Sequence, residues 1–546
     1  MKLIPTTKKS ADTPAPQARA GAGPVPPVPA GLVAFVGTGP GDEGLLTLRA
    51  AELLAKADLV VGRQELTGPL AHRLRERADV ADAADPGTGA KALIKAANAG
   101  QLAVSLFAGD PLLSSRASEQ ADLCARAGVR VEIVPGVPAA TAVPEFAGIP
   151  LTADAGGLRV VHAADISQVE GPAPGSLVIL GAEAGPVDLS KMLVAAGWKD
   201  TTPVAFTWNG TTTDQHTVVS RLGSVAADLK AAGVSMLTEP GPALAVVGDA
   251  AAHEGLSWFE SKPLFGWRVL VPRTKEQAAS LSERLRSYGA VPQEVPTIAV
   301  EPPRTPQQME RAVKGLVTGR YQWIAFTSAN AVRAVREKLE EYGLDARAFA
   351  GVKVAAVGEQ TAAALAVFGI KPDLVPDGEQ SSEGLAAAWP PYDDVLDPIN
   401  RVLLPRADIA TEALVARLTG LGWEAEDVTA YRTVRAAPPP APVREAIKGG
   451  GFDAVLFTSS STVRNLIGIA GKPHAVTVIA VIGPQTAQTA AEYGLRVDVM
   501  APKPSATALA EALAEHGAGL RDAAIAAGEP VRKPSERRRG ARRRLR

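Results

Sequence analysis

The sequence predicts an α/β protein, with parallel sheets flanked by helices in its second half. Three observations lead to this prediction. Near its start, a short apolar run, Leu32 to Val36, leads through a glycine-rich loop into a helical pattern. In the second half, apolar strands alternate with amphipathic helical patterns, as where Trp323 to Phe326 precedes Ala331 to Glu341. That half also contains one series of segments twice, which indicates two similar domains.

Composition excludes several classes of protein. The 546 residues are 46% hydrophobic and 21% charged, which is typical of a globular protein with roughly three or four domains. The single cysteine, Cys124, excludes an internal disulfide, and the six histidines form no His-x-x-x-His pair, so we expect no metal. No stretch of about 18 apolar residues occurs, so we expect no membrane contact and a cytoplasmic location.

The two ends of the chain differ from the rest. Residues 1–30 are rich in Pro and Ala and poor in bulky apolar residues, which predicts a disordered leader. Residues 519–546 form a tail that ends in a basic run, on a chain whose formal net charge is -1. Such a tail binds an acidic partner or is simply a solvated extension. Because no aromatic residues are interleaved with it, we do not expect nucleic-acid binding.

The first strand ends in the loop Gly37 to Asp42. The loop is not a dinucleotide fingerprint, because Asp42 stands where the third glycine belongs and Pro40 interrupts it. A tight strand-to-helix turn is the alternative to a ligand-binding loop. Further segments follow in order, namely Val104–Phe107 with Ala108–Pro111, Val131–Val134 with Pro135–Ala140, Ala147–Thr152, Gly210–Gln215 and Pro242–Gly248.

Together these segments resemble the tetrapyrrole methylase family over residues 31–252, and most of all its uroporphyrinogen-III C-methyltransferase members. The resemblance implies a two-domain α/β unit that binds S-adenosyl-L-methionine, acts on uroporphyrinogen III and forms a homodimer. Glycine loops permit close backbone approach, and their N–H groups suit a carboxylate. The implied cofactor-binding residues are Gly37, Gly39, Pro40, Gly41, Gly109, Asp110, Pro135 and Gly136.

Two departures from the family pattern affect this expectation. Methylating members usually carry Arg-Leu-Lys before Gly-Gly-Asp-Pro, whereas this chain has Ser105 and Phe107 at the two basic positions. An octacarboxylate substrate needs cationic or N–H partners, so we expect each loss to weaken binding by roughly 1 to 3 kcal/mol. The family's Tyr-Asp after the first helix is also replaced, by Gly62-Arg63. Methyl transfer therefore competes with the alternative of an inactive domain kept for binding or folding.

After a linker over residues 253–265, the duplicated half begins. Three pairs of segments recur in the same order, namely Arg268–Arg273 with Arg401–Arg406, Phe326–Ser328 with Phe457–Ser459, and Val357–Ala362 with Ile482–Ala487. In parallel sheets, ligands lie at the carboxyl ends of the strands, where the Thr-Ser and Gly-x-Gln-Thr segments fall. Helices starting there expose unpaired N–H groups to an anion. The alternative is that these Ser and Thr residues only cap helices.

These segments, with Tyr431-Arg432-Thr433, resemble the uroporphyrinogen-III synthase family over residues 266–518. The resemblance implies two interleaved lobes, one formed by 266–300 with 436–518 and the other by 301–435. It also implies the activity: hydroxymethylbilane, which carries eight carboxylates, loses its hydroxyl and closes with inversion of ring D, without a cofactor. Holding the ends of a flexible chain together can lower this barrier.

The family motif implies Tyr431 as the proton donor to the leaving hydroxyl, although a tyrosine packed at the hinge is the alternative. The implied substrate-binding hydroxyls are Thr486, Thr458, Ser459, Ser328 and Thr361. Arg273 and Arg406 end equivalent strands and either pair with substrate carboxylates or cap their own sheets. The leading hypothesis is a bifunctional synthase and methyltransferase of tetrapyrrole synthesis. A synthase with an inactive methylase domain and a non-catalytic tetrapyrrole carrier are the alternatives.

Overall fold

The computed structural model describes residues 31–537, except 83–84, 114–116, 153–155, 170, 173, 182–184, 233–242, 274 and 409–411, and it leaves out the side chains of 243 and 275–278. The expected leader and residues 538–546 of the basic tail lie outside this description. The chain divides into two units, Met1–Ser261 and Lys262–Arg546, which are described separately. Within the described residues, no helix is long and apolar enough to cross a bilayer.

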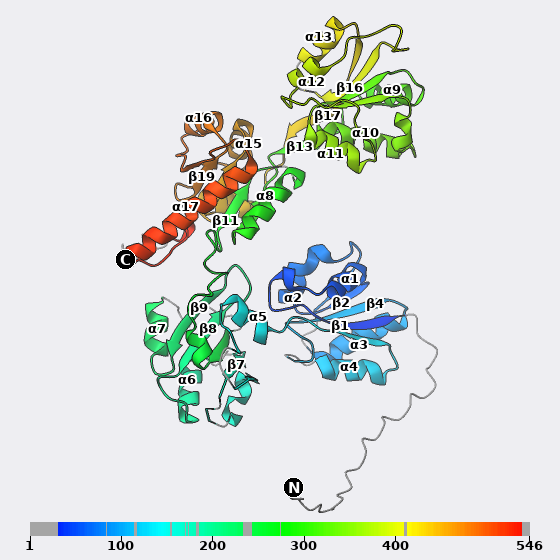
Figure 1. Ribbon diagram of the computed structural model, residues 1–546. Helices are drawn as coiled ribbons and strands as arrows, with labels where there is room; N and C mark the ends of the chain where they lie inside the picture. The colour runs from blue at the N-terminus through cyan, green and yellow to red at the C-terminus, as the bar shows by residue number, and fades with distance from the viewer. Residues whose placement is uncertain are drawn as a thin grey trace, which may run out of the picture. The chain divides into compact units, whose positions relative to one another are not determined.

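The first unit begins with a parallel sheet in the order β3-β2-β4-β1-β5. Its strands are β1 (Leu32–Gly37), β2 (Leu59–Val61), β3 (Asp79–Ala81), β4 (Leu102–Phe107) and β5 (Val131–Val134). Helices cover both faces (Figure 1), with α1 (Leu48–Lys56) and α2 (Gln64–Leu70) on one and α3 (Pro86–Asn98) and α4 (Ala117–Arg126) on the other. Short 3-10 helices η1 (Glu43–Leu45) and η2 (Ala71–Arg73) complete this half.

A mixed sheet forms the second half of this unit, in the order β6-β7-β10-β8-β9. In this sheet β6 and β7 are parallel, whereas the other neighbouring strands are antiparallel. Its elements are β6 (Leu158–His162), η3 (Ala163–Gln168), β7 (Ser176–Leu180), α6 (Pro186–Ala195), β8 (Pro203–Trp208), β9 (His216–Arg221), α7 (Val225–Ala231), β10 (Ala243–Val247) and η4 (Asp249–Ala252). Helix α5 (Ala139–Phe146) packs on this sheet through Ala140 and Val143.

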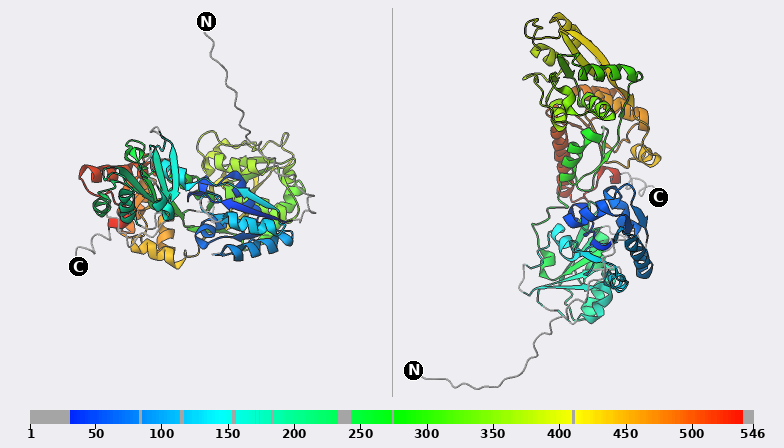
Figure 2. Two further views of the ribbon diagram at one scale, coloured as in Figure 1. Left: turned by 90° about the horizontal axis from the view of Figure 1, so that it is seen from below. Right: turned by 90° about the vertical axis from the view of Figure 1, so that its right-hand side faces the viewer.

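The second unit contains two sheets, which we call lobe 1 and lobe 2. Lobe 1 is parallel throughout, in the order β12-β11-β18-β19-β20. Its elements are β11 (Arg268–Val271), α8 (Lys275–Ser287), β12 (Val291–Glu294), α14 (Ala441–Gly449), β18 (Ala454–Phe457), α15 (Ser460–Ala470), β19 (Val478–Val481), α16 (Pro484–Glu492), β20 (Val499–Met500) and α17 (Ala506–Ala526). Elements from both ends of the unit thus lie side by side, green beside orange and red in Figures 1 and 2.

Lobe 2 lies between these two parts in the sequence and has the strand order β13-β17-β16-β14-β15. Its elements are β13 (Ile298–Glu301), α9 (Pro306–Val317), β14 (Trp323–Phe326), α10 (Ala329–Glu341), η5 (Ala346–Phe349), β15 (Lys353–Ala356), α11 (Glu359–Val367), α12 (Ser382–Ala388), β16 (Arg401–Ala407), α13 (Ala413–Gly420) and β17 (Glu424–Arg435). The chain enters lobe 2 at β13 and leaves it at β17, and these two strands pair antiparallel.

Two of the expected boundaries are wrong by a few residues. The boundary expected at residue 300 falls inside β13, which belongs to the sheet of lobe 2. The boundary expected at 518 falls inside α17, which continues to Ala526. The beginning of the tail also lies on lobe 1, because the Ser535 N–H donates to Asp453 Oδ1 at 2.8 Å.

Candidate functional site

Three neighbouring strands of the first sheet end in glycines that touch one another. A Cβ on Gly37 would lie 2.5 Å from the Gly109 carbonyl oxygen and 2.6 Å from the Gly136 Cα. A Cβ on Gly136 would lie 2.1 Å from the Gly109 oxygen. These approaches are too close for any side chain, so the ends of β1, β4 and β5 can meet only through glycine. The structure therefore brings together three of the residues expected to bind the cofactor.

The loop after β1 joins this cluster to the second sheet. Gly39 has φ +76 and forms two backbone hydrogen bonds with Gly109, at 3.3 and 2.8 Å. Gly41 lies against Thr212, whose Cγ2 would be 2.9 Å from an added Cβ, and the Asp42 N–H donates to Thr211 Oγ1 at 3.0 Å. Thr211 itself has φ +66, a strained conformation for a residue that is not glycine. Strain at such a junction is typical of a ligand-binding loop.

Asp110 stabilises the shape of the cluster. Its Oδ1 accepts the N–H groups of Leu112 and Leu113 at 3.0 and 3.1 Å, and its Oδ2 accepts the Gly136 N–H at 3.3 Å. Pro135 joins β5 to this last glycine. Both carboxylate oxygens of Asp110 therefore accept hydrogen bonds from backbone N–H groups. We interpret this residue as a support for the loops rather than a direct ligand contact.

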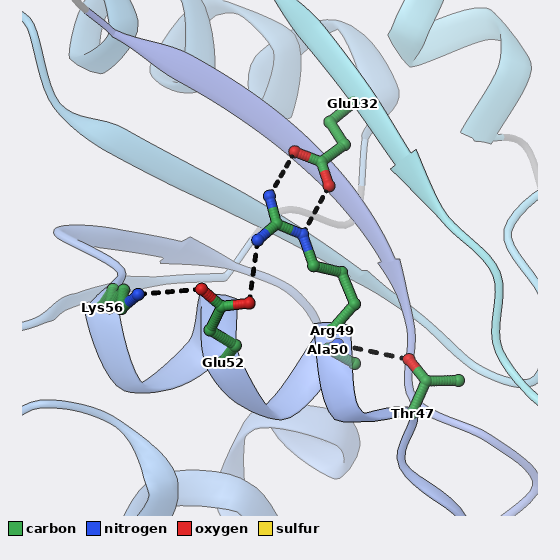
Figure 3. Close-up of polar contacts among 6 residues, drawn as sticks. All are labelled: Thr47, Arg49, Ala50, Glu52, Lys56 and Glu132. Atoms are coloured by element: carbon green, nitrogen blue, oxygen red, sulfur yellow. Dashed lines mark hydrogen bonds and ion pairs between the residues drawn. The ribbon is translucent and has the colours of Figure 1, made fainter.

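An ion-pair group ties the helix after the loop to the sheet (Figure 3). The Thr47 hydroxyl caps α1 by accepting the Ala50 N–H at 3.2 Å. The Arg49 guanidinium, two residues further on, donates to both oxygens of Glu132 on β5, at 2.7 and 2.8 Å, and to Glu52 at 2.9 Å. These hydrogen bonds raise the pKa of Arg49 and lower the pKa of Glu132. The bidentate contact fixes α1 relative to β5.

The structure shows where the side chains of Ser105 and Phe107 lie. Ser105 is buried and donates from Oγ to Gln120 Oε1 on α4 at 2.7 Å. Phe107 packs in the same layer, with its ring centroid 6.1 Å from that of Phe35. Both side chains face the α3 and α4 side of the sheet, so a cation at position 105 would be buried beneath helices. Whether the serine and phenylalanine at these two positions weaken substrate binding stays a prediction.

In lobe 2, a cavity of about 250 Å³ lies at the carboxyl ends of β14 and β15. The first turns of α10 and α11 both open into it, and its lining is formed by Thr327, Ser328, Ala329, Asn330, Val357, Gly358, Gln360, Thr361 and Gln380. Two helix amino termini facing one small cavity favour an anion, because each carries unpaired N–H groups and about half a positive charge. Thr361 is buried in its wall.

Gln380 is a part of this cavity that the sequence did not reveal. Its Oε1 accepts the Glu359 N–H at 3.2 Å and its side chain covers Gly358, where an added Cβ would lie 2.6 Å from that oxygen. Gln380 lies in the irregular segment between α11 and α12, and its contact with the start of α11 depends on the path of that segment. No local pattern predicts such a contact.

Tyr431 and Ser328 meet beside the cavity. Ser328 is the N-cap of α10, as its Oγ accepts the Ala331 N–H at 3.1 Å, and the same Oγ lies 3.0 Å from the Tyr431 hydroxyl. Tyr431 is 7% exposed and packs in the core of lobe 2. The register between β16 and β17 shifts next to it, an irregularity of the kind that re-aims side chains near functional sites. Its neighbour Arg432 is held by Glu301 at 2.5 Å.

The equivalent edge of lobe 1 has the same plan. Ser459 is the N-cap of α15 in a capping box with Thr462, and its Oγ also lies 2.8 Å from Ser461 Oγ. Thr458 directly precedes this cap, and Thr486 is buried in the first turn of α16. The expectation that Ser328 and Ser459 cap helices is confirmed. Whether these hydroxyl groups also contact a substrate stays a prediction.

The two strand-end arginines have different surroundings. Arg406 is 4% exposed and donates from Nε to Asp427 Oδ1 at 2.9 Å, with a second contact from Nη2 to Oδ2. The sequence left open whether Arg406 binds a substrate carboxylate or caps its own sheet, and this ion pair supports the second role. Arg273 is partly buried, and burial lowers the pKa of its guanidinium.

Comparisons with known proteins agree with this division into two units. A family model described as "Uroporphyrinogen-III synthase HemD" matches residues 279–511, and one described as "Tetrapyrrole (Corrin/Porphyrin) Methylases" matches residues 32–226. The chain is 31% identical over 512 residues to the porphyrin biosynthesis protein HemD of Ruminiclostridium josui, an alignment that covers 90% of this chain and 99% of that protein.

Two further similar proteins are methyltransferases. The uroporphyrinogen-III C-methyltransferase of Bacillus subtilis (strain 168) is 29% identical over 379 residues, which are 64% of this chain and 74% of that protein. The crystal structure of uroporphyrin-III C-methyltransferase from Thermus thermophilus, complexed with S-adenosylhomocysteine, is 26% identical and covers 40% of this chain and 98% of its own, with a TM-score of 0.34.

Proposed function

The chain belongs to the family of porphyrin biosynthesis proteins that join a tetrapyrrole methylase domain to a uroporphyrinogen-III synthase domain, and we propose that its second unit converts hydroxymethylbilane to uroporphyrinogen III. The substrate is a flexible linear tetrapyrrole with eight carboxylates. The enzyme has to hold that chain so that its two ends meet, and to assist the departure of one hydroxyl group.

The cavity at α10 and α11 is the observation that supports this proposal most directly. Helix amino termini bind carboxylates through N–H groups that are fixed before the substrate arrives, so little reorganisation is needed during the reaction. Such dipoles also suit several acetate and propionate groups on one substrate. Folding the substrate into a closed geometry would then supply several kcal/mol of the barrier reduction.

Tyr431 is the proposed proton donor. As the C–O bond of the hydroxymethyl group breaks, its phenolic proton passes to the leaving oxygen and water forms. The contact with Ser328 at 3.0 Å holds the phenol oxygen in place at the cavity edge. The proton released when the ring closes returns the phenol to its starting state. Ring D inverts during closure, as the family resemblance implies.

We further propose that the first unit transfers methyl groups to uroporphyrinogen III. The glycine contact of Gly37, Gly109 and Gly136 fits S-adenosyl-L-methionine, because it leaves bare backbone at the carboxyl edge of a parallel sheet. When bound, that cofactor supplies the methyl group. The residues of this chain would bind and orient the cofactor. The loop from Gly39 to Gly41 lies beside the strand ends, and Asp110 holds the backbone of the loops that follow β4 and β5.

Purified full-length protein incubated with hydroxymethylbilane tests the synthase proposal. We expect the III isomer of uroporphyrinogen, separated from the I isomer by chromatography after oxidation. Product that is only the I isomer, which forms spontaneously, would favour a tetrapyrrole carrier.

A separate assay tests the methylase proposal. Titration calorimetry should detect binding of S-adenosyl-L-methionine to the full chain, and a labelled methyl group should appear on added uroporphyrinogen III. Binding without transfer would leave a domain that holds the cofactor but does not use it, and the absence of both would point to an inactive remnant.

A further inference from the structure

The two lobes contain the same pair of charged residues in the same register. Arg273 and Arg406 hold the last position of the repeated segments RVLVPR and RVLLPR. On the neighbouring strand, Glu294 lies opposite Val271 in lobe 1 and Asp427 lies opposite Leu404 in lobe 2. Each lobe therefore offers a strand-end arginine and an acid one strand away.

Only lobe 2 forms the pair. There, Arg406 is buried and bonded to Asp427 by two nitrogens. In lobe 1, the equivalent acid is engaged elsewhere, since Glu294 Oε1 accepts the hydroxyl of Ser282 on α8 at 2.7 Å. Among the described residues, the Arg273 side chain has neither a hydrogen bond nor an ion pair, although it is half buried. A cation that has lost part of its hydration without gaining a counter-ion favours the binding of an anion.

The position of Arg273 fits a role in the substrate site. It follows the carboxyl end of β11, and extending the register of β11 with β18 places it level with Thr458, directly before the cap of α15. This is the edge at which the helix amino termini of lobe 1 begin. A guanidinium here adds a full charge to the partial charges of those helix starts.

We propose that Arg273 binds a carboxylate of the tetrapyrrole in lobe 1, and that Ser282 keeps it available by holding Glu294. This inference rests on the proposed synthase function. It also assigns different roles to the repeated arginines: Arg406 stabilises its sheet, whereas Arg273 receives substrate. Among the described residues, the duplication thus provides two similar lobes that use the equivalent arginine differently, with an ion pair in lobe 2 and none in lobe 1.

Steady-state kinetics of the full chain test the inference. We expect Arg273→Gln to raise KM for hydroxymethylbilane about tenfold or more, the effect of losing a charge-assisted hydrogen bond, with a smaller change in kcat. Arg273→Lys should recover part of the loss. A KM that is unchanged in Arg273→Gln, while the wild type makes the III isomer, would overturn the inference. A wild type that makes only the I isomer would instead refute the proposed function.

Ser282 offers a second test that leaves the arginine intact. In Ser282→Ala, Glu294 is released and can pair with Arg273, so KM should rise. Adding Glu294→Gln to Ser282→Ala should restore the wild-type KM, because the competing anion is gone. Thermal unfolding of each variant separates these effects from lost stability. If Ser282→Ala changes KM and Glu294→Gln does not reverse the change, the proposed competition for Arg273 is wrong.

Discussion

At the scale of single residues, one hydrogen bond joins the catalytic proposal to the fold. Ser328 accepts the Ala331 N–H and contacts the Tyr431 hydroxyl with the same oxygen, so one side chain begins α10 and positions the phenol. Tyr431 is both packed in the core and directed toward the cavity edge. The hinge packing and the proton-donor role, which the sequence presents as alternatives, are compatible in the structure.

Tyr431→Phe removes the proposed proton donor and keeps the ring. We expect kcat to fall by about 10² to 10⁴, the range for general acid catalysis, and stability to fall by about 1 kcal/mol for one hydrogen bond. Tyr342→Phe is the matched control, because it removes the hydroxyl of a tyrosine in the same lobe that is 48% exposed, and it should leave kcat unchanged. A Tyr431→Phe enzyme with a kcat near the wild-type value would exclude the role of Tyr431 as donor.

Gly136→Ala tests the contact of the three glycines in the first unit. The added methyl would lie 2.1 Å from the Gly109 oxygen, so the backbone must move. We expect a lower unfolding temperature and weaker S-adenosyl-L-methionine binding by calorimetry. Gly519→Ala is the control, because no atom lies within 4 Å of its added Cβ and it is in the interior of helix α17, where alanine is favoured. Equal effects of the two substitutions would contradict the account of this contact.

At the scale of secondary-structure elements, side chains that cross between elements hold the sites in shape. The pair of Arg406 and Asp427 joins β16 to β17, the strand that also carries Tyr431. The group of Arg49 and Glu132 joins α1 to β5 beside the glycine loop. Both contacts lie near strand ends, so losing either would allow a site to change shape without unfolding its sheet.

Asp427→Asn should destabilise lobe 2 by about 1 to 2 kcal/mol, because it removes the anion of the buried Arg406 cation, although solvent screens part of this loss at the half-exposed Asp427. Glu294→Gln, the equivalent change in lobe 1, should have little effect on stability, as Arg273 does not bond to Glu294. Chemical denaturation of the full chain measures both. If both substitutions lowered the free energy of unfolding by a similar amount, the two lobes would not differ in how they use the arginine and the acid.

The contact between α1 and β5 should weaken in acid. Hydrogen bonding to Arg49 lowers the pKa of Glu132 in the folded chain below its ordinary value. A carboxyl of this kind stabilises the fold above its unfolded pKa, and the stabilisation is lost as the pH falls through the folded pKa. Glu132→Gln should therefore reduce the dependence of the unfolding temperature on pH below about 4.5. If the unfolding temperature of Glu132→Gln depended on pH as that of the wild type does, the contact between Arg49 and Glu132 would not contribute to stability.

At the scale of the whole molecule, the repeated segments and the alternation of strands with helices predicted most of the architecture. Local patterns are sufficient for this, since the caps at Ser328 and Ser459 depend only on neighbouring residues. The pair of Arg406 and Asp427 could not be predicted, because it depends on the register of two strands. The buried direction of Ser105 and the antiparallel pairing of β8 with β10 also depend on tertiary packing.

The central claim is that one chain both closes the tetrapyrrole and methylates it. The most direct measurement is incubation of the purified chain with hydroxymethylbilane and S-adenosyl-L-methionine labelled in its methyl group, without added uroporphyrinogen III, followed by separation of the products. The account predicts labelled methyl groups on a macrocycle of the III series. Unlabelled isomer I as the only macrocycle would contradict it.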